Sequence, residues 1–157
     1  MKLIAKYITS LILLVFLISF FQETVNSWGF FGHRKINRMA VFTLPPEMIK
    51  FYKKNIEYIT EHAVDPDKRR YAVDGEAPRH YIDIDHYVHS GEDPFSVVPE
   101  KWFDAVDKFT EDTLQAYGIV PWHVNVMVTR LTKAFEEKNV DRILHFSADL
   151  GHYVGDS

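Results

Sequence analysis

The chain has 157 residues, no cysteine and a formal net charge of −4, from 18 basic and 22 acidic side chains. An acidic protein has no general electrostatic attraction for nucleic acid or anionic membranes, so any recognition of phosphate must be local. The absence of cysteine excludes disulfides and thiolate metal sites. Any metal site must therefore use nitrogen and oxygen ligands, such as those of the eight histidines.

The first 27 residues have the pattern of a secretory signal peptide. Two lysines precede an almost unbroken apolar run over residues 8–21, and small residues at 25–27 form a cleavage pattern in front of Trp28. The run has 14 residues, fewer than the roughly 20 that a membrane-spanning helix needs, and a retained anchor is the alternative. Cleavage would leave residues 28–157 as one exported domain, secreted or periplasmic, with 16 basic and 21 acidic side chains and a charge of −5.

Apolar residues at helical spacing predict helices over residues 32–43, 46–59, 99–118, 121–138 and 142–156. Pro46 suits the first turn of the second helix, and Asp141 is the predicted N-cap of the last one. Between Ala63 and Pro99 turn residues interrupt the pattern, although Tyr81–Ile84 alternates as a short strand does. The aromatic residues and histidines of this long loop favour order. The predicted fold class is therefore all-α, a single multi-helix domain with one long ordered loop.

The last predicted helix carries the most informative pattern, with His145, Asp149, His152 and Asp156 at i, i+4, i+7 and i+11. This spacing places the four polar residues along one stripe between apolar flanks. A histidine and an aspartate four residues apart can hold one ion, as the paired histidines of metalloprotease helices do. The stripe rises ~16 Å, too far for a single ion, so the two pairs must have different roles. Two self-pairing couples on a solvated face are the alternative.

Trp28 becomes the N-terminal residue if the signal peptide is cleaved after Ser27. A free α-amine has a pKa of about 7.7–8.0. When neutral, this amine can bind a metal ion together with its own carbonyl oxygen, in a five-membered chelate. His33 lies five residues further on and can close over the same ion. Without cleavage, Trp28 is predicted to be a buried aromatic anchor.

Four separated motifs together resemble the zinc-dependent phospholipase C and single-strand nuclease superfamily. They are Trp28-Gly29 with Gly32-His33, then Asp65, then His80-Tyr81-Ile82-Asp83, and finally His152-Tyr153-Val154-Gly155-Asp156. Their order along the chain and the tryptophan at the predicted cleavage point match the family pattern. The resemblance implies an exported, mostly helical enzyme that hydrolyses phosphodiester bonds with three zinc ions.

The resemblance assigns six residues to two zinc sites that share one carboxylate. One zinc ion is expected to bind Trp28 and His33, and its neighbour is expected to bind Asp65, His80 and His152. Asp156 resembles the carboxylate that bridges the two ions, so Asp65 and Asp156 are the expected catalytic carboxylates.

Other positions match the family less directly. Asp67 lies two residues from Asp65 and can take its place. His145 and Asp149 have no counterpart and are expected to be partners of metal-binding histidines or a pair on the helix face. The family's third zinc ion uses residues beyond the bridging aspartate. Because the sequence ends at Ser157, the chain is expected to be C-terminally truncated and poorly active alone.

Two residues of the loop suggest the substrate. Tyr81 and Asp83 are similar in position to a base-stacking aromatic and a base-contacting carboxylate of the nucleases, although Tyr81 as a core residue is the alternative. The expected function is zinc-dependent hydrolysis of phosphodiester bonds, foremost in single-stranded nucleic acid, with phospholipase C activity on phospholipids as the alternative. Other readings are a non-catalytic exported zinc-binding protein and a plain helical domain. No stable protein partner is implied.

Overall fold

The structure, a computed structural model, describes the backbone from Asn26 to Ser157 and the side chains from Gly29 onward. The predicted signal peptide lies outside the described residues, apart from the backbone of its last two. The prediction of an all-α fold is confirmed, because the described residues form helices, turns and loops and no strand. Within residues 26–157, no helix combines the length and apolar character needed to cross a membrane.

The elements follow the chain in a simple order, in which η denotes a 3-10 helix. They are α2 (Asn26–Ala40), η1 (Val41–Thr43), α3 (Pro46–Lys54), α4 (Ile56–Glu61), η2 (His62–Val64), α5 (Asp65–Arg69), η3 (Ala77–His80), η4 (Ile84–His86), α6 (Pro94–Val97), α7 (Trp102–Phe109), α8 (Glu111–Tyr117), α9 (Val120–Glu136) and α10 (Val140–Asp156).

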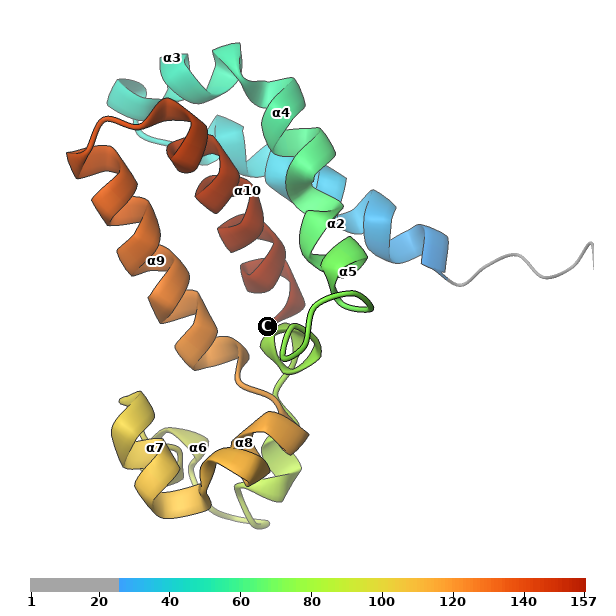
Figure 1. The fold of residues 1–157 in the computed structure, drawn as a ribbon, viewed down its shortest axis with the longest axis vertical. Coiled ribbons are helices and arrows are strands. Elements are labelled where there is room, and N and C mark those ends of the chain that lie inside the picture. The colour runs from blue at the N-terminus through green and yellow to red at the C-terminus, as the bar shows by residue number, and fades with distance from the viewer. Residues whose placement is uncertain (1–25) are drawn as a thin grey trace, which may run out of the picture.

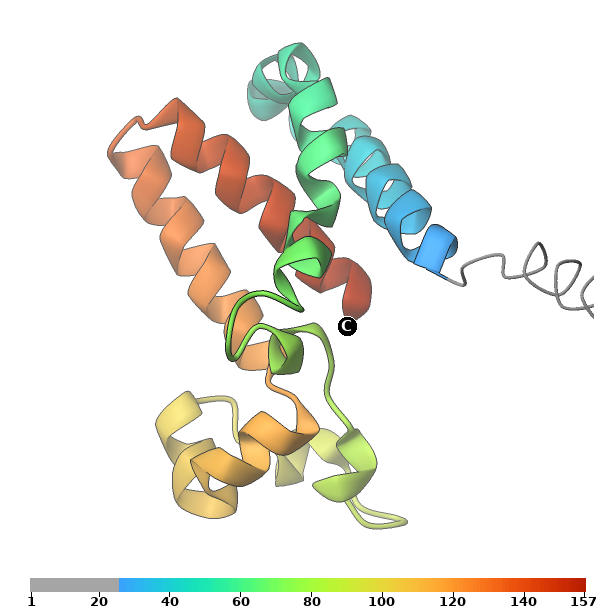
Figure 2. The ribbon, with the colours of Figure 1, turned by 45° about the vertical axis from the view of Figure 1, so that its right-hand side comes forward.

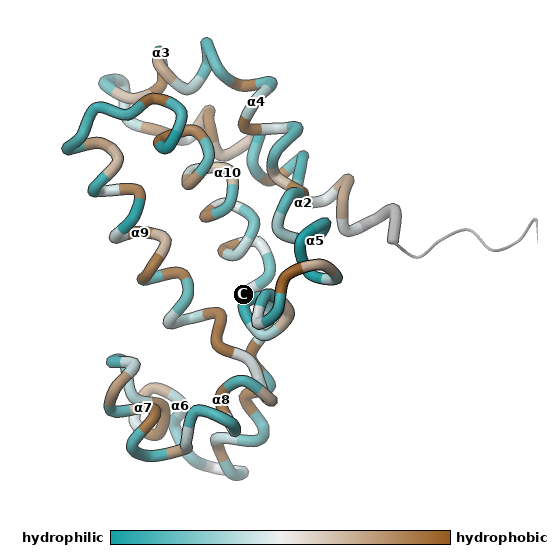
Figure 3. Tube along the Cα trace, viewed as in Figure 1, coloured by the Kyte–Doolittle hydropathy of each residue, from teal (hydrophilic) through white to brown (hydrophobic). Residues whose placement is uncertain are grey.

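Helix α10 is the central element of the arrangement. It packs against α9 on one side and against α2 and α4 on the other, as Figure 1 shows. Figure 2, turned by 45°, shows α6, α7 and α8 gathered in a smaller lobe at the foot of the molecule, away from α3 and α4. Both α9 and α10 mix hydrophobic and hydrophilic residues along their length (Figure 3), as amphipathic helices do when they bury one face.

The N-cap of α10 differs from the predicted one. The N-cap of α10 is Asn139, whose side-chain oxygen accepts a hydrogen bond from the backbone N–H of Arg142 at 3.1 Å. Asp141, the predicted cap, lies instead in the first turn of the helix. There its carboxylate still interacts favourably with the positive end of the helix dipole.

Two predicted helices are each divided in the structure. Residues 46–59 form α3 and α4, separated at Asn55, whose side-chain amide donates to the Phe51 carbonyl at 2.9 Å. Residues 99–118 form α7 and α8, separated at Thr110, which has a φ of 69° and accepts from the Thr113 N–H at 3.4 Å. In both cases a short polar side chain bonds to the backbone and offers it an alternative to a continuous helix.

The predicted long loop is ordered, but it consists of short helices from η2 to α6 joined by turns. The strand considered for Tyr81–Ile84 does not form. Tyr81 is extended, with φ −151° and ψ 170°, and its carbonyl accepts from the Val120 N–H at 3.2 Å. The Asp83 N–H donates to the Tyr117 carbonyl at 2.7 Å. These two bonds attach the loop to the junction of α8 and α9.

The main core lies where η1, α3, α4, α9 and α10 meet. Its buried residues are Val41, Tyr52, Ile59, Ala134, Ile143, Leu144 and Ala148. Asn37 is only 2% exposed and donates to the carbonyls of Ala148 at 2.9 Å and Ile59 at 3.5 Å, which joins three helices. Opposite it, a Cβ added at Gly151 would lie 2.3 Å from the Asn37 Oδ1 atom. Glycine therefore allows α2 and α10 to approach closely.

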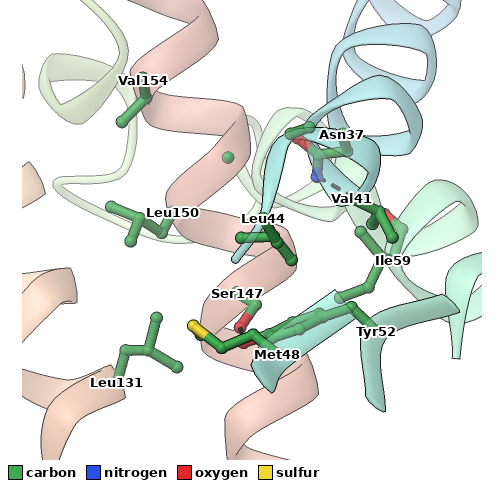
Figure 4. Close-up of a pocket in the computed structure, with 12 residues that line it drawn as sticks. Asn37, Val41, Leu44, Met48, Tyr52, Ile59, Leu131, Ser147, Leu150 and Val154 are labelled. Carbon is green, nitrogen blue, oxygen red and sulfur yellow. Dashed lines mark hydrogen bonds between the residues drawn. The ribbon is translucent and has the colours of Figure 1, made fainter. Parts of the chain in front are cut away.

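An apolar pocket of about 260 Å³ opens beside this contact (Figure 4). Leu131 lies on one side of it and Val41 with Ile59 on the other, and Met48 approaches from α3. The Tyr52 hydroxyl and the Ser147 hydroxyl share a hydrogen bond of 2.7 Å at its base. The pocket is therefore bounded by elements that already belong to the main core.

The lobe has a second core around Tyr87, Ala105, Leu114, Ile119 and Trp122. Gly118 connects this core to the loop. It has a φ of 93°, and an added Cβ would lie 2.1 Å from the Tyr81 carbonyl oxygen. The residue is glycine for two reasons, the left-handed backbone and the close backbone approach.

We expect Gly118→Ala to lower the free energy of unfolding by more than Gly91→Ala. Gly91 has a similar φ of 92°, but a Cβ there would meet nothing within 4 Å. Gly91→Ala should thus cost about 1 kcal/mol of backbone strain, whereas Gly118→Ala adds a steric displacement of Tyr81. Urea unfolding of the two variants measures the difference. Equal losses would contradict a close contact between Gly118 and Tyr81.

Candidate metal centre

Helix α10 contributes two residues of a cluster of imidazoles and carboxylates. His152 is completely buried, and its Nδ1–H donates to the Ala63 carbonyl at 2.7 Å. This bond assigns the proton to Nδ1, because a carbonyl oxygen can only accept. The other nitrogen, Nε2, therefore faces the cluster, toward Asp156 one turn further along the helix.

Five residues from four elements converge around this nitrogen. They are His33 from α2, Asp67 from α5, His80 from η3, and His152 and Asp156 from α10. Helix α10 provides two of the five residues. Helix α2 lies beside it because of the close contact at Gly151 and provides His33, and the long loop provides the other two. The C-terminal end of α10 lies next to this loop in both Figure 1 and Figure 2.

Three ligand atoms form a tight group on one side of the cluster. His152 Nε2 lies 3.1 Å from His80 Nδ1 and 3.1 Å from Asp156 Oδ2, and His80 Nδ1 lies 2.9 Å from the same oxygen. Asp67 Oδ1 completes the group at 3.8 Å from each of the two nitrogens. The four atoms are two imidazole nitrogens and two carboxylate oxygens.

A second group shares both carboxylates. His33 Nε2 lies 3.2 Å from Asp156 Oδ1 and 3.9 Å from Asp67 Oδ2. Each aspartate thus directs one oxygen toward His33 and the other toward His80 and His152. The imidazoles of His33 and His152 stack with their centroids 3.9 Å apart. This arrangement is one in which two neighbouring cations can share two bridging carboxylates.

The donor set and its spacing fit zinc. Zinc binds imidazole nitrogen and carboxylate oxygen at about 2.0–2.2 Å, so two ligands of one tetrahedral ion lie about 3.3–3.6 Å apart. The separations of 2.9–3.1 Å in the tight group are only slightly shorter. His152 Nε2 faces the Asp156 carboxylate oxygen at 3.1 Å, an approach that is favourable only with a proton or a metal ion between the two atoms. In addition, the buried atoms His33 Nδ1 and His80 Nε2 have no hydrogen-bond partner among the described residues.

The pKa values of Asp156 and His33 are both shifted in the direction that favours the charged form of the group. Burial alone would raise the pKa of Asp156, but hydrogen bonding with His152, His33 and His80 outweighs it and holds that pKa well below its usual range. The pKa of His33 is raised, first by its hydrogen bond with Asp156, while burial opposes the shift. Asp156 is therefore ionised at neutral pH, as a carboxylate that binds a metal ion must be.

Asp65, the predicted ligand, does not lie in the cluster. Its carboxylate bonds to His62 Nδ1 at 2.5 Å and to Lys68 Nζ at 2.8 Å. Successive residues of a helix are rotated by about 100°, so residues two apart on α5 face nearly opposite sides. The structure therefore brings Asp67 to the position for which Asp65 was predicted, and Asp65 belongs to a separate group on the other side of the helix.

Of the two roles expected for His145 and Asp149, the structure shows the pair on one helix face, to which Arg69 is added. Asp149 accepts a hydrogen bond from Arg69 at 2.7 Å, and His145 Nε2 lies 3.6 Å from the same oxygen. The side-chain partners of Asp149 are thus Arg69 and His145, and not His33, His80 or His152. Its role is to hold Arg69, at the end of α5, against α10.

Glu76, which no sequence pattern indicated, is the centre of this buried network. It is 1% exposed and accepts hydrogen bonds from the Tyr153 hydroxyl and from Arg79 Nη1 at 2.6 Å, with Arg69 Nε at 3.6 Å. Burial would raise its pKa, but Tyr153 and the two guanidinium groups outweigh it and lower that pKa. Its Oε1 atom lies 3.9 Å from the unpartnered His80 Nε2. The network thus holds the loop, and with it His80, against α10.

The remaining predicted site residues lie outside the cluster. The Tyr81 hydroxyl donates to the Ala116 carbonyl at 3.2 Å, so this side chain packs on α8. Asp83 is exposed on the lobe side. The backbone of Trp28 lies in the first turns of α2, but its side chain is outside the described part of the chain. A role for Trp28 as a ligand therefore stays a prediction.

The cluster opens into a pocket of about 380 Å³. His33, Asp67 and Asp156 form its floor, and Phe30, Arg70 and Tyr71 complete its lining together with Gly29. Arg70 is exposed and has no ion pair within residues 26–157. The pocket thus combines an anionic floor that can bind metal ions with a cationic side chain at the mouth.

We expect Glu76→Gln to lower the free energy of unfolding by roughly 2 kcal/mol, because two guanidinium groups would lose a buried counter-charge. Glu57→Gln is the matched control. Glu57 pairs with Arg38 at 2.8 Å but is 74% exposed, so its loss should change stability by less than about 0.5 kcal/mol. Urea unfolding monitored by circular dichroism measures both. A similar small effect of the two substitutions would contradict a structural role for the buried network.

Comparison of the chain with protein-family models, with curated proteins and with solved structures finds no match.

Proposed function

We propose that the protein is an exported zinc-dependent phosphodiesterase whose metal centre is the cluster on α10. The observation that carries the proposal is the convergence of His33, Asp67, His80, His152 and Asp156, whose ligand atoms lie within 4.8 Å of one another in two overlapping groups. Two cations that share carboxylates suit an in-line displacement at phosphorus. The ordered motifs that resemble the zinc-dependent phospholipase C and single-strand nuclease superfamily support the same function.

The chain's own residues have distinct parts in this proposal. Zinc would supply an activated water and neutralise charge on the phosphoryl group. Asp156 and Asp67 would each be shared by the two metal positions, because each directs one oxygen to each group. Arg70, at the mouth of the same pocket, is placed to attract the anionic phosphate of a substrate.

The lining of the pocket favours nucleic acid as the substrate. Tyr71 is 88% exposed and Phe30 37% exposed at the mouth. Aromatic side chains on a pocket rim can stack with unpaired bases, which always present a π-face. The alternative, hydrolysis of a choline phospholipid, would use the same aromatic residues to contact a quaternary ammonium group.

We expect the protein to bind zinc, and we expect Asp67→Asn to weaken the binding at least about tenfold, since loss of even an outer-shell partner typically costs that much. Asp65→Asn should bind zinc as the parent does, because Asp65 pairs with His62 and Lys68 instead. Isothermal titration with zinc, after removal of metal with a chelator, measures both. The opposite ranking of the two variants would contradict the assignment of Asp67, and no zinc uptake by the parent would favour a plain helical domain.

We expect slow but detectable zinc-dependent hydrolysis of single-stranded RNA or DNA by this chain, with still less turnover of phosphatidylcholine. Asp156→Asn should lower kcat/KM by at least about a hundredfold, because a shared ligand of both ions is lost, whereas Glu57→Gln should leave the rate unchanged. Release of nucleotides and of phosphocholine measures the two activities. Faster phospholipid turnover would select the phospholipase alternative. Stoichiometric zinc binding without hydrolysis of either substrate would identify a non-catalytic zinc-binding protein.

A further inference from the structure

The charge of the chain is distributed very unevenly. Residues 83–117, which include η4, α6, α7 and α8 and are called here the acidic lobe, contain nine acidic and two basic side chains, a net of −7. The whole chain carries −4, so the remaining residues together carry +3. The acidic lobe is the part that Figures 1 and 2 show at the foot of the molecule, away from α3 and α4.

Two neighbouring pockets lie where the acidic lobe meets α9. One has a volume of about 460 Å³ and lies against Ile82, Pro94 and Phe95. The other has a volume of about 340 Å³ and lies against Trp102 and Phe103.

Both pockets share Glu100, Trp122 and Asn125 in their walls. They are therefore two halves of one groove, called here the aromatic groove, with Glu100 at the boundary between them.

The aromatic groove exposes large apolar side chains to solvent. Phe95 is 96% exposed and Phe103 is 80% exposed, more than any other phenylalanine among the described residues. The core beneath them is intact, since the Trp122 indole N–H donates to the Pro99 carbonyl at 3.0 Å and its ring packs on Trp102 at 5.9 Å. The two phenylalanines are thus not needed to close that core, and their exposure is typical of a binding surface.

Glu100 gives the aromatic groove a charge. Its carboxylate is exposed and takes part in no ion pair or hydrogen bond within residues 26–157. Lys101 lines the second pocket, but the acidic lobe remains strongly negative around it. A cationic side chain placed beside Glu100 would also lie near the aromatic rings that line both pockets, where cation–π attraction adds to the ion pair.

We propose that the aromatic groove binds a basic peptide segment of a partner protein, in which an arginine or lysine is flanked by apolar residues. The apolar residues would occupy the two pockets and the cation would pair with Glu100. Charge complementarity favours this partner over nucleic acid and anionic membranes, both of which a lobe of charge −7 repels. The proposal does not depend on zinc binding, because no residue of the metal cluster lines the groove.

Titration calorimetry with a blocked peptide, Leu-Ser-Arg-Ser-Leu-Lys, tests the proposal on the whole protein. We expect binding that weakens as salt is raised toward physiological strength of about 0.15 M. A peptide with glutamate in place of arginine and lysine should not bind, and one with serine in place of both leucines should bind at least tenfold more weakly. Phe95→Ala and Glu100→Gln should each weaken binding about tenfold or more.

Matched controls separate the aromatic groove from general surface effects. Phe42→Ala removes an exposed phenylalanine of η1, and Glu57→Gln removes an exposed carboxylate of α4, both outside the acidic lobe. Both should bind the peptide as the parent does. The proposal would be overturned if Phe95→Ala and Glu100→Gln bound the basic peptide as tightly as the parent does. It would also be overturned if the parent failed to bind that peptide. Sedimentation of the protein with phosphatidylcholine vesicles, lost in Phe95→Ala, would instead make the groove a membrane contact.

Discussion

The hydrogen bond from His152 Nδ1 to the Ala63 carbonyl is the interaction on which the rest of the site depends. It joins the C-terminal part of α10 to the start of the long loop, between residues 89 positions apart in sequence. It also fixes the orientation of the ring, so that Nε2 faces the cluster. One bond thus determines both where the loop begins to cover α10 and which atom of His152 is available to a cation.

The candidate metal centre consists of helical residues held by polar contacts that have no part in its chemistry. Glu76, with Tyr153 and two arginines, holds the loop that carries His80. A buried carboxylate between two guanidinium groups is stable only when every partner is present, because each isolated charge would be costly in the interior. The precision of such a site comes from this outer layer as much as from the ligands themselves.

The positions of the helices were easier to predict from the sequence than the contacts between residues of different elements. The i, i+4 spacing correctly placed His152 and Asp156 side by side on one face of α10, because helical periodicity depends only on local spacing. The spacing could not decide between Asp65 and Asp67, since both lie in one short turn and the choice depends on the direction in which α5 approaches the cluster.

The division of helices at Asn55 and Thr110 was likewise missed. Glu76 was missed because one glutamate in a loop has no periodic signal, and only burial reveals it.

The close approach of α2 and α10 has a consequence beyond packing. Asn37 and Gly151 meet about one helical turn from His33, on one helix, and directly beside His152, on the other. The distance between the two imidazoles is therefore set by a helix crossing and not by the imidazoles themselves. A larger residue at position 151 would act as a spacer between the two halves of the centre. Such a residue would change which metal ions the cluster can bind, since metal ions differ in the ligand distances and geometry that they require.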